Sequence, residues 1–191
     1  MRSKSFIDSA MKSNIPDIKR VKQGKGFKQV NSCDYCGSSE RELYLKKNGM
    51  NIYTCSKCNL TYSSSVPNNF DDLYSADEYL DHTIEAYEAN SGFRKKRFGV
   101  ERVNIIREHK NKGTLLDLGC GIGWFLEVAK EYYDILGVEI SDSLRAYMKE
   151  KKGISSFKSL NEVDDESVDI ITAFDLIEHV ESPSDMLENI Y

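Results

Sequence analysis

Four of the five cysteines form two matched pairs whose spacing suits a metal ion. Cys33 and Cys36 make one Cys-x-x-Cys pair, and Cys55 and Cys58 make the second, with 18 residues between Cys36 and Cys55. Four thiolates in this arrangement can surround a tetrahedral zinc ion, and such a closed site contributes folding energy instead of catalysis. A redox dithiol is the alternative, but two matched pairs in a reducing compartment favour structural zinc.

A glycine-rich turn, LLDLGCGIGWF, has the composition of a nucleotide cofactor site. Asp117 ends a short apolar run and is followed by Gly119, Gly121 and Gly123. Glycines let a ligand approach the backbone closely at the carboxyl end of a parallel strand. The spacing G-x-G-x-G differs from the G-x-G-x-x-G of dinucleotide-binding proteins, which is weak evidence on its own.

The acidic residues near this turn indicate which cofactor it serves. A carboxylate at Asp117 repels a pyrophosphate but attracts an ammonium or a sulfonium ion. Because S-adenosylmethionine carries both cations and no phosphate, we predict it as the cofactor. Glu139 ends the next apolar run, where a carboxylate can accept hydrogen bonds from both ribose hydroxyls. That position supports an adenosine-containing ligand of either kind.

Several linked motifs resemble a known family. LLDLGCGIGWF, ILGVEIS and VDIITAFDLIEHV are similar to motifs of the class I S-adenosylmethionine-dependent methyltransferases. The pairs CDYCG and CSKCN resemble the zinc-ribbon subgroup that includes sugar C-methyltransferases. The resemblance covers residues 33 to 191, and it is specific for the superfamily but much less so for the substrate.

The resemblance implies roles for the cofactor-binding residues. Asp117 and the glycine turn are expected to hold the methionine end of S-adenosylmethionine, and Glu139 is expected to bind the ribose. The family often places an acidic or polar residue after the third strand, near the adenine. This chain has Lys158, Ser159 and Leu160 there, so Ser159 and Leu160 are the candidates for the adenine contact.

The family also lines the transferred methyl group with residues that follow the fourth strand. This implies that Phe174, Asp175, Glu178 and His179 lie near the reacting centre, with Phe174 and Asp175 among the residues that bind the cofactor. His179 is the candidate general base, because a neutral imidazole can accept a proton near physiological pH. Alternatively, Glu178 and His179 orient a loop or cap a helix. Cys120 is interpreted as a small turn residue, since methyl transfer is a direct displacement that needs no enzyme-bound intermediate.

Alternating strands and helices are predicted to position these residues. Apolar runs predict strands at 115–118, 135–140, 154–160 and 168–174, separated by helical patterns. This order is typical of an α/β fold with a Rossmann-like parallel sheet and flanking helices. It would supply the first four strands of a seven-stranded methyltransferase fold, preceded by the small zinc ribbon.

The helices between these strands have recognisable ends and faces. Apolar side chains recur at helical spacing over residues 124–132, so Trp124 and Phe125 are core residues before they are ligand contacts. The next helix is expected to end near Gly153, a favourable C-cap residue. Ser182, followed by a proline, is the expected N-cap of the last helix.

Changes in composition predict four segments along the chain. They are a flexible basic arm (1–31), a zinc-ribbon module (32–65) with a hairpin turn at Lys47-Asn48-Gly49, a helical lid or connector (66–112) and an incomplete S-adenosylmethionine-binding domain (113–191). The arm holds eight lysines and arginines against two aspartates, which is common in solvated tails but can also anchor an acidic surface.

The connector contains three tyrosines, Tyr74, Tyr79 and Tyr87, in an acidic stretch. Their hydroxyls can form a lid over substrate or cofactor, whereas simple packing against the following domain is the competing interpretation.

The overall composition excludes several classes of protein. Apolar residues make up 40% of the chain and charged residues 30%, and no window approaches the roughly 20 apolar residues of a membrane span. The N-terminus lacks the apolar core of a secretory signal, so a cytoplasmic location is expected. The net charge of −5 disfavours binding to nucleic acid, although it does not exclude a locally basic arm.

Three functions are compatible with these features. The first is methyl transfer to a small molecule, such as a nucleotide sugar or a surface-polysaccharide precursor. The second is a non-catalytic binding or interaction module. The family's sheet has seven strands in the order 3-2-1-4-5-7-6, and only the first four in sequence are predicted here. We therefore expect this chain to be a fragment of a longer methyltransferase or a C-terminally truncated member. The third, an RNA methyltransferase that uses the ribbon and the arm, is disfavoured by the net acidity. The sequence predicts neither the acceptor atom nor an oligomeric state.

Overall fold

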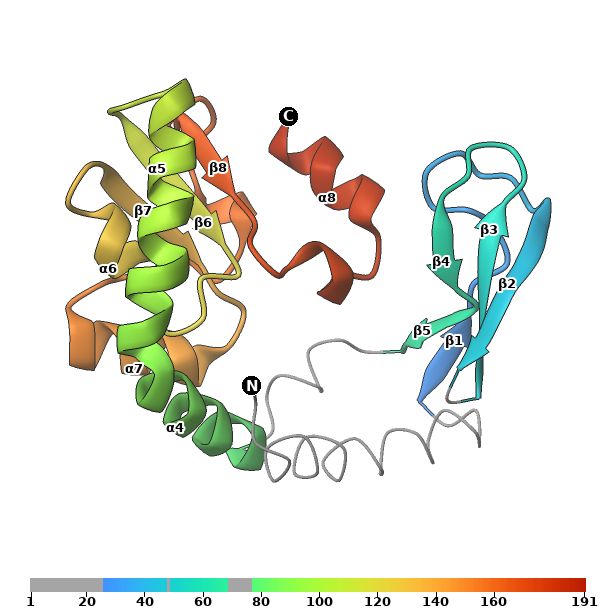
Figure 1. Cartoon of the computed structure of the whole chain (residues 1–191), viewed down its shortest axis with the longest axis horizontal. Coiled ribbons are helices and arrows are strands. Elements are labelled where there is room, and N and C mark those ends of the chain that lie inside the picture. Colours follow the sequence, from blue (N-terminus) through green and yellow to red (C-terminus); the bar gives the residue numbers. More distant parts are fainter. Residues whose placement is uncertain (1–25, 48, 69–76) are drawn as a thin grey trace. The chain divides into compact units, whose positions relative to one another are not determined.

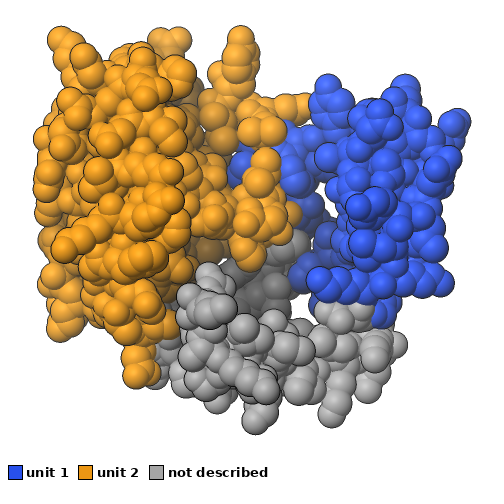
Figure 2. Space-filling model, in the orientation of Figure 1, with its two compact units in different colours: residues 1–69, 181–186 blue, residues 70–180, 187–191 orange. Residues whose placement is uncertain are grey.

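The computed structural model describes residues 26–47, 49–68 and 77–191, and side chains in the last range from residue 84 onward. The chain divides into two compact units, coloured separately in Figure 2. The first comprises residues 1–69 and 181–186, and the second comprises residues 70–180 and 187–191.

The first unit is built from short antiparallel strands. Strand β1 (Phe27–Gln29) pairs with β5 (Ser65–Pro67). Strands β2 (Arg41–Lys47), β3 (Met50–Cys55) and β4 (Thr61–Ser63) form a second sheet in the order β2-β3-β4 (Figure 1). Most of the expected basic arm lies outside the described residues. Its last residues form β1, so the prediction of a flexible arm is wrong there.

The hairpin between β2 and β3 has the predicted position. Lys47 pairs with Met50, which leaves two residues for the turn, and Gly49 has a positive φ of 87°. A side chain is strained in this backbone conformation, which explains the glycine. A β-bulge between Leu43 and Leu45 interrupts the register of the two strands.

A nearly continuous helical segment opens the described part of the second unit. Helix α4 (Asp77–Arg94) runs into a π-helix, η1 (Lys95–Gly99), and then into α5 (Val100–His109) (Figure 1). A side chain at Gly99 would place its Cβ 2.9 Å from Val128 Cγ2, so the helix packs closely at this point. These helical residues lie within the segment expected to be a helical lid or connector. No helix of the described residues combines the length and the apolar character that crossing a membrane requires.

A parallel sheet forms the centre of the second unit. Strand β6 (Thr114–Leu118) lies between β7 (Asp134–Val138) and β8 (Ile170–Thr172). Leu115 pairs with Ile135 on one side and with Ile170 on the other. The predicted Rossmann-like parallel sheet with flanking helices is therefore confirmed (Figure 1), although β8 is shorter than expected.

The strand predicted at 154–160 is wrong. Only Phe157 makes a bridge to β7, where its N–H donates to the carbonyl of Gly137 at 2.9 Å. The chain then turns, because the Ser159 hydroxyl accepts a hydrogen bond from the backbone of Asn161 and starts a short 3₁₀ helix, η2 (Leu160–Glu162). The apolar residues of this segment mark one bridge and a turn instead of a strand.

The helix predicted over 124–132 is also much shorter in the structure. Only Leu126–Ala129 is α-helical, as α6. After it, the N–H groups of Glu131 and Tyr132 bond to carbonyls three residues back, those of Val128 and Ala129, and the segment continues as turns. Trp124 and Phe125 are nevertheless buried in the core, as expected.

The two remaining helices begin and end near the predicted residues. Helix α7 (Asp142–Lys152) has Ser141 as its N-cap and ends at Gly153, whose φ is 66°. Helix α8 (Pro183–Ile190) follows Ser182, whose hydroxyl accepts a hydrogen bond from the Asp185 N–H at 3.1 Å. Both capping predictions are confirmed.

The core of the second unit lies beside the central strand. Its fully buried side chains come from several elements, so burial of apolar surface joins the helices to the sheet. Among its members are Val103, Leu115, Leu126 and Met148.

Candidate functional site

The four paired cysteines converge in the first unit. Their sulfur atoms all lie within 4.8 Å of one another, and the pairs Cys33–Cys58 and Cys36–Cys55 are 3.5 Å apart. These separations exceed the ~2 Å of a disulfide bond. Zinc–sulfur bonds of about 2.3 Å in a tetrahedron place the sulfurs about 3.8 Å apart. The cluster therefore has the size of a tetrahedral metal site.

Each cysteine pair is held in a tight turn. The Gly37 N–H donates to the carbonyl of Cys33 at 2.8 Å, and the Asn59 N–H donates to Cys55 at 3.0 Å. Gly37 and Asn59 have φ values of 70° and 64°, as expected for these turns. Backbone N–H groups of Cys58 and Lys57 face the Cys55 sulfur and lower the pKa of Cys55 to about 6.

The same cluster resists full ionisation without a cation. The backbone N–H of Leu60 lowers the pKa of Cys58, but burial and the three neighbouring sulfurs raise it to about 12. A divalent metal offsets this repulsion, because it interacts with all four thiolates at once. The donor set and its spacing thus fit zinc.

The second site begins at the glycine turn after β6. The N–H groups of Gly119 and Cys120 both donate to the carbonyl of Val138, at 2.8 and 3.0 Å, and fix the turn to the neighbouring strand. Gly121 has a φ of 56° and open space where a side chain would lie. Gly123 has a φ of 74°, and a Cβ there would lie 2.4 Å from Met148 Sδ. The turn therefore requires glycine for two reasons, backbone conformation and packing.

Asp117 lies at the carboxyl end of β6 and is only 5% exposed. Its Oδ1 accepts a hydrogen bond of 2.7 Å from the Thr172 hydroxyl of the neighbouring strand β8. Burial raises the pKa of Asp117 to about 7, and the charge of Glu139 also raises it, whereas Thr172 and Arg102 lower it. A buried carboxylate of this kind favours a cationic partner.

A hollow opens beside this carboxylate. It contains about 450 Å³ of space, part of which is open solvent. Five of the predicted cofactor-binding residues line it: Asp117, Gly119, Gly121, Phe174 and Asp175. The other lining residues are Tyr87, Arg94, Arg102, Cys120, Ile122, Trp124 and Phe125.

Two arginines of the lining are absent from the sequence-based prediction. The Arg102 Nη2 donates to Asp175 Oδ2 at 3.0 Å, and the Arg102 guanidinium lies 4.1 Å from the ring centroid of Phe174. The Arg94 guanidinium lies over the ring of Tyr87 at 4.6 Å. Nothing in the sequence pattern marks them, since basic residues on helices usually lie in solvent.

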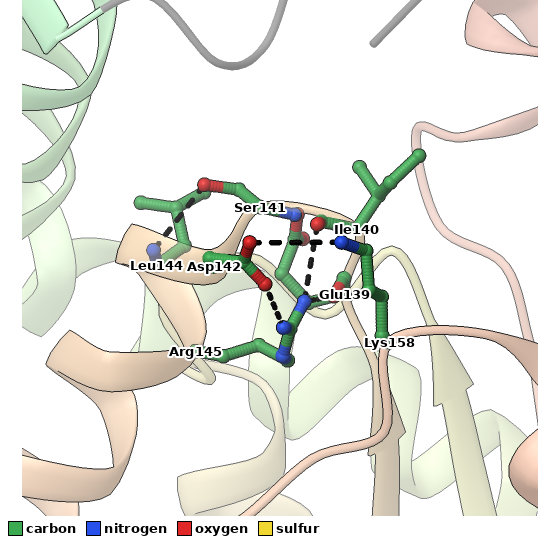
Figure 3. A network of polar contacts seen from close by, with 7 residues as sticks. All are labelled: Glu139, Ile140, Ser141, Asp142, Leu144, Arg145 and Lys158. Atoms are coloured by element: carbon green, nitrogen blue, oxygen red, sulfur yellow. Dashed lines mark hydrogen bonds and ion pairs between the residues drawn. The ribbon is translucent and has the colours of Figure 1, made fainter.

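Glu139 is held next to the glycine turn, and Figure 3 shows it among the residues that follow β7. Its Oε2 accepts from the Gly121 N–H and its Oε1 from the Ser141 N–H, both at 2.9 Å. Burial raises the pKa of Glu139, while these N–H groups lower it. Glu139 is thus hydrogen-bonded to the rim of the hollow without being one of its lining residues.

Figure 3 also shows what fixes the backbone around Glu139. The Arg145 Nη1 donates to the carbonyls of Glu139 at 2.7 Å and Ile140 at 3.0 Å, and Arg145 also pairs with Asp142. The Lys158 Nζ lies 3.6 Å from Asp142. This network anchors the loop between β7 and α7.

The remaining predicted residues lie outside the lining of the hollow. Ser159 and Leu160 form the turn after the Phe157 bridge. His179 lies in a short 3₁₀ helix, η3 (Ile177–His179), and both His179 and Glu178 are exposed.

The three tyrosines of the expected lid differ in what can be said of them. Tyr74 and the side chain of Tyr79 lie outside the described residues. Tyr87 is half-buried, packs against the core and lines the hollow. Packing and contact with a ligand are therefore compatible for this residue.

Known proteins resemble this chain in sequence and in fold. Residues 92–191 match the family described as a methyltransferase domain, whereas no curated protein matches the chain. One similar structure is the plantazolicin methyltransferase BpumL in complex with SAH (S-adenosylhomocysteine), with a TM-score of 0.51 and 17% identity over 63% of this chain and 51% of BpumL. Another is magnesium protoporphyrin IX methyltransferase from Synechocystis with bound SAH, with a TM-score of 0.52 and 14% identity over 64% of this chain and 67% of that enzyme.

The chain spans about half the length of BpumL, and these likenesses show a shared fold. The family match, in contrast, identifies the family of the chain, because residues 92–191 are more than half of the 191 residues. The chain belongs to the methyltransferase domain family.

Proposed function

We propose that the hollow beside β6 binds S-adenosylmethionine and that the protein transfers its methyl group to a small molecule. The observation that carries this proposal is the buried carboxylate of Asp117, which lies at the carboxyl end of the central strand and lines the hollow with the glycine turn. A carboxylate in this position disfavours a pyrophosphate and favours the ammonium group of a methionine.

The rest of the cofactor can be assigned to neighbouring residues. Each oxygen of Glu139 accepts one backbone hydrogen bond and keeps a further lone pair, so the carboxylate can also accept from the ribose hydroxyls. Ser159 and Leu160 are proposed for the adenine end. The glycine turn would pass under the methionine portion of the cofactor.

The acceptor is proposed to bind beyond the methyl group, near Phe174 and Asp175. Asp175 has a positive φ of 57°, a conformation that costs energy for a residue other than glycine and is frequent at functional sites. His179 follows in the same segment and is proposed as the general base. If this is its role, His179→Ala removes turnover and leaves the affinity for SAH unchanged. Retained turnover would exclude it.

A small-molecule acceptor, for example a nucleotide sugar or a surface-polysaccharide precursor, is the class that we propose. Support comes from the similar folds, whose names refer to plantazolicin and to magnesium protoporphyrin IX. The sugar itself is suggested by the resemblance of the cysteine motifs to those of sugar C-methyltransferases.

We also propose that the four clustered cysteines hold one structural zinc ion. The close approach of their sulfurs and the backbone N–H groups directed at Cys55 support this assignment. Such a site has no open coordination position, so its contribution would be to the stability of the first unit.

The cofactor assignment can be tested by the fluorescence of Trp124, which is the single tryptophan of the chain and lines the hollow. We expect a saturable change of its emission on titration with SAH and none with NAD⁺, whose pyrophosphate would meet Asp117. Binding of NAD⁺ in preference to SAH would contradict the proposal.

A further inference from the structure

Two positively charged side chains line the hollow, although an ammonium group needs only a negative partner. They are the guanidinium groups of Arg94 and Arg102, which line the hollow together with Asp117. The methionine end of S-adenosylmethionine is a zwitterion, with a carboxylate next to the ammonium group. If Asp117 meets the ammonium, as the proposed function states, the carboxylate requires a cationic partner when it leaves water.

The two arginines differ in how their charge is used. Arg102 forms an ion pair with Asp175 at 3.0 Å, and its side chain is only 18% exposed. It also lies over the rings of Phe174 and Trp124, at 4.1 and 5.2 Å. Its guanidinium is thus fixed by a carboxylate and two aromatic rings, and two of these three partners, Phe174 and Asp175, belong to the proposed acceptor side of the hollow.

Arg94 has a different environment. Its guanidinium lies over the aromatic rings of Tyr87 and Trp124, at 4.6 and 5.8 Å. Among the side chains that the structure describes, no carboxylate forms an ion pair with it. Aromatic faces orient a guanidinium but leave its N–H donors available, because the donors lie in its plane.

The backbone around Arg94 is well anchored. Arg94 is the last residue of α4 and precedes the π-helix η1. In the π-helix, Lys95 pairs with Glu127 at 2.9 Å, and Gly99 packs against Val128. π-Helical insertions are frequent at functional sites, where they change the direction of neighbouring side chains.

We propose that Arg94 binds the α-carboxylate of the cofactor's methionine, while Arg102 holds Asp175 on the acceptor side. This assignment rests on the proposed function. It divides the hollow into an amino-acid subsite, with Asp117 for the ammonium and Arg94 for the carboxylate, and an acceptor side formed by Arg102, Phe174 and Asp175.

The experiment compares two ligands that differ only in the amino-acid portion. SAH contains it, whereas 5′-methylthioadenosine keeps the adenosine and the thioether sulfur but lacks the amino and carboxyl groups. Dissociation constants are measured for the parent chain and for Arg94→Met, with Arg97→Met as the control. Arg97 is exposed, pairs with Glu101 and is not a lining residue.

We expect Arg94→Met to raise the Kd for SAH about tenfold to a hundredfold, the loss of one charge-assisted hydrogen-bonded pair. The Kd for 5′-methylthioadenosine should change less than twofold, and Arg97→Met should change neither value. An unchanged urea midpoint of Trp124 emission would show that each variant is folded.

Three results would overturn the assignment. Arg94→Met can weaken both ligands equally, which would mean that Arg94 shapes the hollow without binding the carboxylate. Arg102→Met, and not Arg94→Met, can remove the preference for SAH. The parent chain can bind both ligands equally well. If the parent binds neither ligand, the proposed function itself fails, and the assignment of Arg94 fails with it.

Discussion

At the scale of single residues, Asp117 combines a cost in stability with a proposed role in binding. Its carboxyl group is buried and accepts a hydrogen bond from Thr172. Its pKa is raised to about 7, with burial as the largest cause. Near neutral pH the carboxylate is therefore only partly ionised in the ligand-free protein. A cationic ligand binds the ionised form, so ligand binding and proton release are linked at this residue.

This cost predicts how stability depends on pH. In the unfolded chain the Asp117 carboxyl has its ordinary pKa of 3.8, so between about pH 4 and pH 7 the folded state binds more protons than the unfolded state. The contribution of Asp117 to the free energy of unfolding therefore falls as the pH rises through this range. Asp117→Asn removes the ionisation and can keep a hydrogen bond to Thr172.

We expect the free energy of unfolding of Asp117→Asn to rise relative to that of the parent by about 2 to 3 kcal/mol as the pH increases from 5 to 8. Urea denaturation followed by the emission of Trp124 measures this difference for the second unit alone, because the chain has no other tryptophan. A difference that stays constant with pH would show that Asp117 titrates near its ordinary value.

At the scale of elements, two residues of the glycine turn are glycine for different reasons, one for packing of the fold and one for binding. Gly123 faces Met148, and a Cβ there would lie 2.4 Å from Sδ, whereas Gly121 lines the hollow, and a Cβ at that residue would have no heavy atom within 4 Å. Both residues have positive φ values. Alanine is strained at either residue, but it meets a packed neighbour at Gly123 only.

Alanine at these two glycines should therefore have different effects. We expect Gly123→Ala to lower the free energy of unfolding by about 2 to 4 kcal/mol, through backbone strain and displacement of Met148. Gly121→Ala should cost only about 1 to 2 kcal/mol but should raise the Kd for SAH, since its methyl group enters the hollow. Urea denaturation and SAH titration of both variants check this, and the reverse order of effects would contradict the geometry of the turn.

At the scale of the whole molecule, the two units should depend on different stabilising factors. The first unit consists of short strands around the cysteine cluster, whereas the large apolar core lies in the second. A small module with little apolar burial commonly depends on a metal for stability. Removal of the metal should therefore affect the first unit far more than the second.

We expect about one zinc ion per chain by elemental analysis, and its loss in Cys58→Ser. Cys120→Ser is the matched control, because Cys120 lies in the glycine turn of the other unit and should leave the metal content unchanged. Chelation should leave the urea midpoint of Trp124 in place. A first unit that stays folded without metal would contradict a structural role for zinc.

Much of this architecture follows from local signals in the sequence. The paired cysteines, the turn at Gly49 and the caps at Ser182 and Gly153 each depend on a few adjacent residues, and the structure has them in the predicted positions. Strand β6 and its glycines are likewise marked by an uninterrupted apolar run followed by a turn.

The errors arise where distant contacts decide the structure. The residues around Phe157 are apolar enough for a strand, yet only one bridge to β7 forms before the chain turns at Ser159. Arg94 and Arg102 resemble ordinary surface residues of a helix in the sequence. Their position at the hollow depends on how the helical segment packs against Trp124 and Phe174, which periodicity does not encode.

The most direct test of the central claim is a calorimetric titration of the chain with SAH at pH 8. We predict one binding site per chain, with an affinity about tenfold or more weaker in Asp117→Asn, because a charge-assisted interaction with the ammonium group is lost. Asp134→Asn, at the exposed amino end of β7, should bind as the parent does. No binding of SAH at millimolar concentration, or equal affinity of the parent and Asp117→Asn, would contradict the assignment of this hollow as the cofactor site.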